Sequence, residues 1–105
     1  MSEHAPRMIT ITKPDDWHIH LRQDQALTTT VQHAAMQFNR VVVMPNCVPP
    51  ITDVNSALKY QKHILAQVPS AYNSTFQPLL TLYLTDQTTS EMIKFASVDP
   101  NILGA

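Results

Sequence analysis

The chain has 105 residues, of which 44% are hydrophobic and 14% are charged, with a formal net charge of −1. This length suits one small domain or part of a larger one, and the nearly neutral charge argues against nucleic acid or an anionic membrane as a partner. Cys47 is the only cysteine and no run approaches the ~20 apolar residues of a spanning helix, so we expect no internal disulfide and a cytoplasmic protein.

Two strand-like patterns open the chain. Residues 8–12 suit a short additional strand, and residues 17–22 alternate strictly between apolar and polar side chains, as a half-buried strand does. The polar side of this second strand carries His18, His20 and Arg22.

Helical spacing and short apolar runs then alternate. Apolar residues recur every three or four positions over residues 27–38, after a predicted N-cap at Asp24, and again over residues 54–68 after Thr52 and Asp53. Between them, residues 41–44 form a continuous apolar run, which is typical of a strand covered on both faces.

The same order continues along the rest of the chain. Residues 79–84 form another apolar strand, and Thr88 with Glu91 three residues later has the spacing of a capping box at the start of a third helix. Residues 102–105 read as the opening of a fourth strand. Alternating strands and helices predict an α/β fold with a parallel sheet.

Three βα units do not close a barrel, so this pattern leaves two architectures: a small open sheet, or the N-terminal portion of a (β/α)₈ TIM barrel. An inner strand of an open sheet has two apolar faces, whereas the mouth of a barrel accepts inward polar side chains. The polar side of residues 17–22 therefore favours the barrel.

The same polar side offers a candidate metal site. His18 and His20 leave one face of a strand about 6.5–7 Å apart at the backbone, from where both imidazoles can reach one zinc ion. Arg22 follows on that face, and a guanidinium there can bind a carboxylate between itself and the metal. The alternative is a polar edge strand whose histidines face water, because two ligands fall short of the three or four that zinc requires.

Polar residues also follow the two apolar strands. Asn46 comes directly after the first of them, where side chains face the ligand crevice of parallel α/β folds, and its amide suits a carboxylate. Its spacing alone favours a simple turn residue ahead of two prolines. Thr85 and Asp86 follow the next strand and could face the same site, but we favour either of them as a cap of the helix that follows.

Together these motifs resemble one family. Residues 15–22 (DDWHIHLR), 42–46 (VVMPN), 49–50 (PP) and 83–86 (YLTD) are similar to the N-terminal part of bacterial-type dihydroorotase, a member of the amidohydrolase superfamily of metal-dependent barrels. The resemblance implies a zinc-dependent cyclic amidohydrolase that reversibly converts N-carbamoyl-L-aspartate to (S)-dihydroorotate in de novo pyrimidine (UMP) biosynthesis. It also implies that His18 and His20 bind the more buried zinc of a two-metal site, that Arg22 and Asn46 bind the substrate carboxylate, and that the whole protein is a homodimer.

The family's remaining ligands have no match in this sequence. They are a carboxylated lysine, two further histidines and an aspartate that acts as general base and acid. We therefore expect residues 1–105 to be the N-terminal part of a single barrel domain, with the lysine just after Ala105 and no catalytic residue within this chain. After the arginine the family commonly has an acidic residue and a glycine; Gln23 and Asp24 stand here, so we expect the turn, not the ligands, to differ.

Two other functions fit the same residues. Another cyclic-amide hydrolase, allantoinase-like or dihydropyrimidinase-like, would keep the histidine pair but need not place Arg22 and Asn46 for a carboxylate. A small non-catalytic α/β binding module would leave His18 and His20 exposed on a strand. Zinc content separates the enzymes from the module, because the module would hold none.

Overall fold

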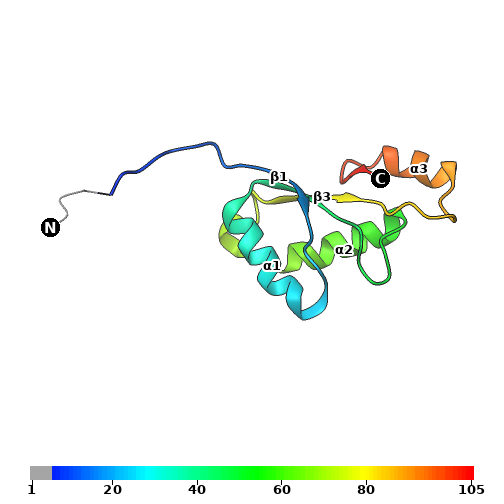
Figure 1. Cartoon of the computed structure of the whole chain (residues 1–105), viewed down its shortest axis with the longest axis horizontal. Helices are drawn as coiled ribbons and strands as arrows, with labels where there is room; N and C mark the ends of the chain where they lie inside the picture. Colours follow the sequence, from blue (N-terminus) through cyan, green and yellow to red (C-terminus); the bar gives the residue numbers. More distant parts are fainter. Residues whose placement is uncertain (1–5) are drawn as a thin grey trace.

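A four-stranded parallel sheet forms the centre of the molecule in the computed structural model, which describes residues 6–105. Its strands lie in the order β1 (Asp16–Ile19), β2 (Arg40–Val43), β3 (Gln77–Thr81) and β4 (Ile102–Gly104). The helices between them are α1 (Asp24–Gln37), α2 (Val54–Ala66) and α3 (Ser90–Ser97), with a 3₁₀ turn, η1 (Ser70–Tyr72), after α2 (Figure 1). The predicted parallel α/β order, three βα units and a fourth strand, is confirmed.

The main apolar core lies between the sheet and helices α1 and α2, which Figure 1 shows on the same side of the sheet. Its fully buried members include Val41 and Leu80 from the strands and Val31 and Ile64 from the helices. Val42 alternates with its neighbours and therefore points to the opposite face, where it pairs in register with Leu79. Both are buried, so the sheet is apolar on two faces, as the continuous runs predicted.

The N-cap residue agrees with the sequence prediction for α2 but not for α1 or α3. Of the two residues expected before α2, Asp53 and not Thr52 is the cap, accepting a hydrogen bond from the Ser56 backbone N–H at 2.8 Å. Helix α1 begins one residue earlier than expected, since Gln23 is its N-cap and Asp24 is its first residue. Helix α3 is capped by Thr89 and not by Thr88. None of the described helices has the length and hydropathy needed to cross a membrane.

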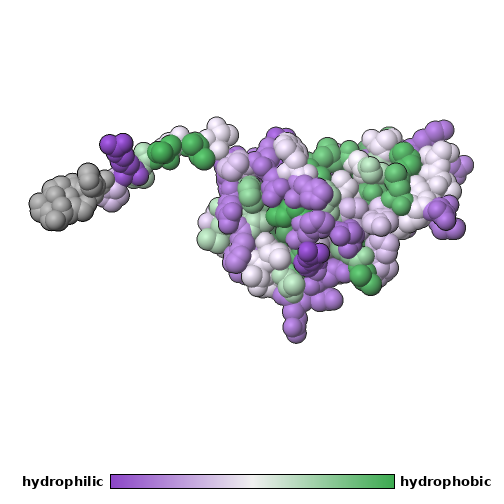
Figure 2. Space-filling view, viewed as in Figure 1, coloured by the Kyte–Doolittle hydropathy of each residue, from purple (hydrophilic) through white to green (hydrophobic). Residues whose placement is uncertain are grey.

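Three strand predictions differ from the structure. Residues 8–12 form no strand; they lie in an extended, exposed segment that projects from the rest of the molecule (Figure 2). The alternating pattern of residues 17–22 predicted a strand to Arg22, but β1 ends at Ile19. The apolar run of residues 79–84 likewise outlasts β3, which ends at Thr81.

Charged residues before β1 hold it against β2. Asp15 accepts hydrogen bonds from the backbone N–H of Arg40 at 3.0 Å and from its guanidinium at 2.6 Å. These bonds to Arg40 hold the pKa of the Asp15 carboxyl below its usual range. The Arg40 guanidinium also lies 5.1 Å from the centre of the Trp17 ring. These contacts fix β1 beside β2 and so set where the residues following each strand meet.

Candidate functional site

The site is built where β1 and β2 end. Because the strands are parallel, the segments that follow them emerge at one edge of the sheet. The backbone N–H of Met44 donates to the Ile19 carbonyl at 2.8 Å, which continues the pairing one residue past β2. This contact brings the residues after Ile19 next to the residues after Met44, and so His20 next to Asn46.

The two histidines come together as predicted. Ile19 packs against the core, so its neighbours His18 and His20 both leave the opposite face of the chain. Their Nε2 atoms lie 3.2 Å apart and their ring centres 5.1 Å apart. Two lone pairs do not face each other at that distance unless a proton or a cation lies between them.

Asn46 decides which nitrogen of His20 carries the proton. The Asn46 side-chain oxygen lies 2.8 Å from Nδ1 of His20, and an amide oxygen only accepts hydrogen bonds. His20 therefore donates through Nδ1–H and keeps a lone pair on Nε2, the atom that faces His18. Asn46 therefore contacts His20. A residue that served only as a turn before the two prolines would not need this contact.

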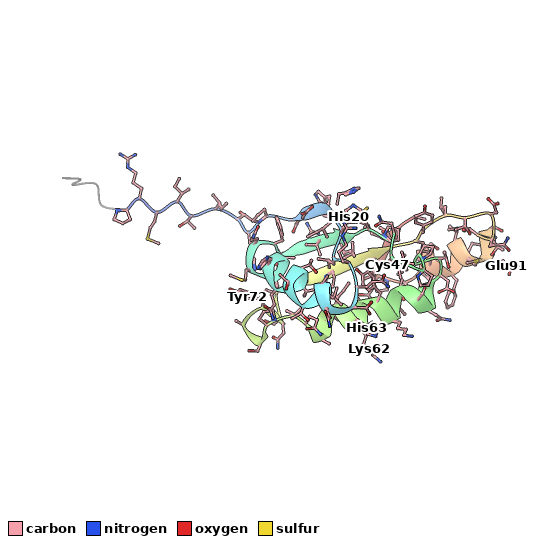
Figure 3. The ribbon with its side chains drawn as sticks, turned by 60° about the horizontal axis from the view of Figure 1, so that its bottom comes forward. His20, Cys47, Lys62, His63, Tyr72 and Glu91 are labelled. Atoms are coloured by element: carbon pink, nitrogen blue, oxygen red, sulfur yellow. The ribbon has the colours of Figure 1, made fainter. Side chains whose placement is uncertain are left out.

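Arg22 lies in the same place. It lines a pocket of about 150 Å³ together with His20, Asn46, Cys47 and Tyr60. Leu21, between the histidine and the arginine, is fully buried and anchors the segment in the core. Figure 3 shows His20 and Cys47 beyond the strands, in the segments that follow β1 and β2. Three of the four predicted site residues therefore share one pocket, and His18 adjoins it through His20.

The histidine pair fits a zinc ion. Two Zn–N bonds of ~2.0–2.1 Å at a tetrahedral angle place the nitrogens roughly 3.3–3.4 Å apart. The observed separation of 3.2 Å is close to this value, and the Nδ1–H of His20 is engaged as in many metal-bound histidines. Within residues 6–105 no third histidine, cysteine or carboxylate joins the pair, so these residues could supply at most two ligands of such a centre.

Tyr60 is a site residue that the sequence interpretation missed. It lies on α2, is 5% exposed, and its hydroxyl donates to the backbone carbonyl of Arg22. Cys47 is beside it, and burial raises the pKa of the Cys47 thiol, more than Tyr60 and Arg22 lower it. The thiol therefore keeps its proton. Cys47 behaves as a small half-buried residue and not as a thiolate ligand of a metal.

Neither Thr85 nor Asp86 caps α3, and Thr85 has another role. The backbone N–H of Thr85 donates to the Thr88 hydroxyl at 2.9 Å, and the Thr85 hydroxyl accepts from the backbone of Gln87 at 3.1 Å. Thr85 and Thr88 thus close the turn before α3, and the cap itself is Thr89.

Curated relatives of this sequence are dihydroorotases. The chain is 52% identical over 88 residues to "Dihydroorotase" of Teredinibacter turnerae, which is 84% of this chain and 25% of the relative. It is 51% identical over 88 residues to "Dihydroorotase, mitochondrial" of Oryza sativa, covering 84% and 21% of the two chains. With Idiomarina loihiensis dihydroorotase it shares 47% over 96 residues, 91% of this chain and 27% of the relative. No protein family model matches the sequence.

Solved structures agree in fold. The crystal structure of dihydroorotase from Campylobacter jejuni superposes with a TM-score of 0.71 at 29% identity, over 81% of this chain and 24% of that one. The dihydroorotase of Saccharomyces cerevisiae, solved in complex with 5-fluoroorotic acid, gives a TM-score of 0.74 over 85% and 23% of the two chains. At 23% identity this second likeness concerns the fold alone.

The chain spans about a quarter of the length of the curated relatives it matches. Over that quarter, the parallel strand and helix order is that of the N-terminal part of a dihydroorotase barrel, as the sequence motifs predicted. In sequence and in fold, this chain therefore resembles dihydroorotases over most of its own length.

Proposed function

We propose that residues 1–105 are the N-terminal part of a single barrel domain of a dihydroorotase, which reversibly cyclises N-carbamoyl-L-aspartate to (S)-dihydroorotate in de novo pyrimidine biosynthesis. The observation that carries this proposal is the pair of Nε2 atoms of His18 and His20, 3.2 Å apart, beside a pocket that Arg22 and Asn46 line. Identity to dihydroorotases over 84–92% of the chain supports the choice of reaction.

Each residue has a separate part in this function. His18 and His20 would hold zinc, and zinc bound there would supply Lewis-acid activation of the substrate carbonyl. Arg22 presents two parallel N–H donors to the substrate carboxylate, and the amide of Asn46 adds a third donor. Because Arg22 lines the same pocket as His20, a substrate whose carboxylate is bound by Arg22 would lie close to the imidazoles.

The reaction also requires groups that residues 6–105 do not bring to the pair. We assign these to the rest of the protein: a carboxylated lysine just beyond Ala105 and two further histidines that would hold the metal, and an aspartate that would act as general base and acid. A cytoplasmic homodimer completes the proposal, and sedimentation velocity and cell fractionation test these two features.

The test uses the full-length protein that carries this chain, purified with its metal. We expect about two zinc ions per chain by elemental analysis. His18→Asn loses at least one of them together with turnover of N-carbamoyl-L-aspartate. His63→Asn is the matched control, because His63 is an exposed histidine on α2 outside the histidine pair, and it should change neither quantity.

Arg22→Met then tests the substrate class. We expect the zinc content to be kept and kcat/KM for N-carbamoyl-L-aspartate to fall on the order of a hundredfold, since a charged hydrogen-bonded partner of the carboxylate is lost. Arg7→Met, in the exposed segment before β1, should be silent. Unchanged turnover in Arg22→Met, or a zinc-free wild-type protein, would contradict the proposal.

A further inference from the structure

Arg22 has a backbone conformation that its residue type does not favour. Its φ is 64°, in the left-handed region where a side chain with a Cβ crowds the following carbonyl. Residues keep such a conformation only when the surrounding structure holds them in it, and they concentrate at functional sites.

A side chain from a distant element contacts the backbone of Arg22. The hydroxyl of Tyr60, 38 residues further along the chain, donates to the carbonyl of Arg22. Tyr60 is 5% exposed and its ring is part of the core between α2 and the sheet, so the hydroxyl has a fixed position. Burial raises the pKa of Tyr60 far above its usual range, which keeps the proton on the hydroxyl for donation.

A second contact ties the next residue down. The side-chain oxygen of Gln23 accepts a hydrogen bond from the backbone N–H of Val48 at 3.0 Å. The segment from His20 to Gln23 is thus held on one side by α2 and on the other by the loop after β2. Tyr60, Arg22 and His20 line one pocket, and the charge of Arg22 acts on both the Cys47 thiol and the Tyr60 hydroxyl.

We propose that Tyr60 is a positioning residue for substrate binding: its hydroxyl holds the Arg22 carbonyl, and so keeps the left-handed backbone that directs the guanidinium into the pocket beside His20. This inference rests on the proposed carboxylate-binding role of Arg22. Tyr60 itself touches no reacting atom. Its effect on the reaction passes through Arg22.

The test is Tyr60→Phe in the full-length zinc protein, which removes one oxygen and keeps the ring in the core. We expect KM for N-carbamoyl-L-aspartate to rise roughly tenfold, with kcat changed less than about twofold and zinc content unchanged, because a positioning contact for binding is lost. Tyr83→Phe is the matched control, since Tyr83 is 44% exposed and lies outside the pocket. All assays are run well below the unfolding midpoint of each variant.

A double-mutant comparison separates positioning from a general loss of stability. In an Arg22→Met background the guanidinium is absent, so adding Tyr60→Phe should no longer change KM. An equal rise of KM in both backgrounds, or no rise in the wild-type background, overturns the inference while leaving dihydroorotase activity intact. A wild-type protein without that activity overturns the proposed function and, with it, this role of Tyr60.

Discussion

At the scale of single residues, the side-chain amide of Asn46 has two ends that serve different partners. Its oxygen accepts from Nδ1 of His20 at 2.8 Å and so fixes the orientation of the imidazole. Its NH₂ group remains a donor for a carboxylate in the pocket. Groups that accept from the second nitrogen of a metal-bound histidine orient the ring and strengthen metal binding. Asn46 therefore connects the proposed zinc ligands with the proposed carboxylate site.

Substitution of Asn46 separates these two functions. In Asn46→Ala the acceptor is lost, and we expect zinc to bind about 10–100-fold more weakly, measured by competition with a chromophoric chelator. Asn46→Asp keeps an acceptor for His20 but replaces the NH₂ donor by a negative oxygen, so zinc affinity should hold while KM for the substrate rises. Asn73→Ala, an exposed position after η1, is the control. Unchanged zinc affinity in Asn46→Ala would contradict the contact with His20.

At the scale of elements, the sequence predicted the order of strands and helices and the face on which His18 and His20 lie, but not where β1 stops. The alternation of side chains continues through Arg22, whereas the backbone leaves the strand after Ile19. Alternation of side chains indicates which side of the chain a residue faces, but it does not indicate the sign of φ. The φ angles of Arg22 and Asp24 are positive, which a strand does not allow. The cap of α3 failed similarly, because Thr88 and Thr89 are adjacent candidates and only the geometry distinguishes them.

The start of α1 gives a test of this backbone conformation. Asp24 has a φ of 55° and is the first residue of the helix. It stands where the family that the motifs resemble commonly has glycine. Aspartate tolerates the left-handed region better than most residues, and its charge favours a helix N-terminus. These two properties explain how the turn is made here without glycine.

We therefore expect glycine and alanine at this position to reverse their usual order. Asp24→Gly should be more stable than Asp24→Ala by about 1 kcal/mol, because glycine adopts a positive φ without the Cβ penalty. At Gln32, an exposed interior position of α1, Gln32→Ala should be more stable than Gln32→Gly by a similar amount, about 1 kcal/mol. Thermal unfolding midpoints of the four full-length variants measure both differences. The same order at both positions would contradict a left-handed Asp24.

At the scale of the whole molecule, the sequence predicted the site residues that lie in or near the ends of strands. It did not predict the site residue that reaches the pocket through packing of a helix. His18, His20, Arg22 and Asn46 stand directly after or within short strands, and parallel strands bring their ends together. Tyr60 lies mid-helix, and its contact with Arg22 spans 38 residues that no local pattern connects. Its one signal was a hydroxyl on the buried face of α2, since a buried tyrosine usually finds a partner for its O–H.

The sheet edges also concern the whole molecule. Within residues 6–105, β1 pairs only with β2, and β4 pairs only with β3. Large apolar side chains lie exposed at these ends, including Trp17 on β1 at 55%, Leu103 on β4 at 56% and Phe95 on α3 at 64%. Figure 2 shows exposed apolar surface toward the end of the molecule where Figure 1 places α3. Unpaired edges with apolar neighbours pair readily with another chain.

The 105 residues prepared alone should therefore self-associate and show no turnover of N-carbamoyl-L-aspartate, because they carry only the histidine pair of the proposed zinc site and leave two sheet edges unpaired. Light scattering over a range of concentrations measures the association. Leu103→Lys places a charge on the β4 edge and should shift the distribution toward the monomer. Met36→Lys adds the same charge at a 59% exposed position on α1, away from both edges, and should leave it unchanged. A monomer at every concentration, or an equal effect of the two lysines, would show that the sheet edges do not drive association.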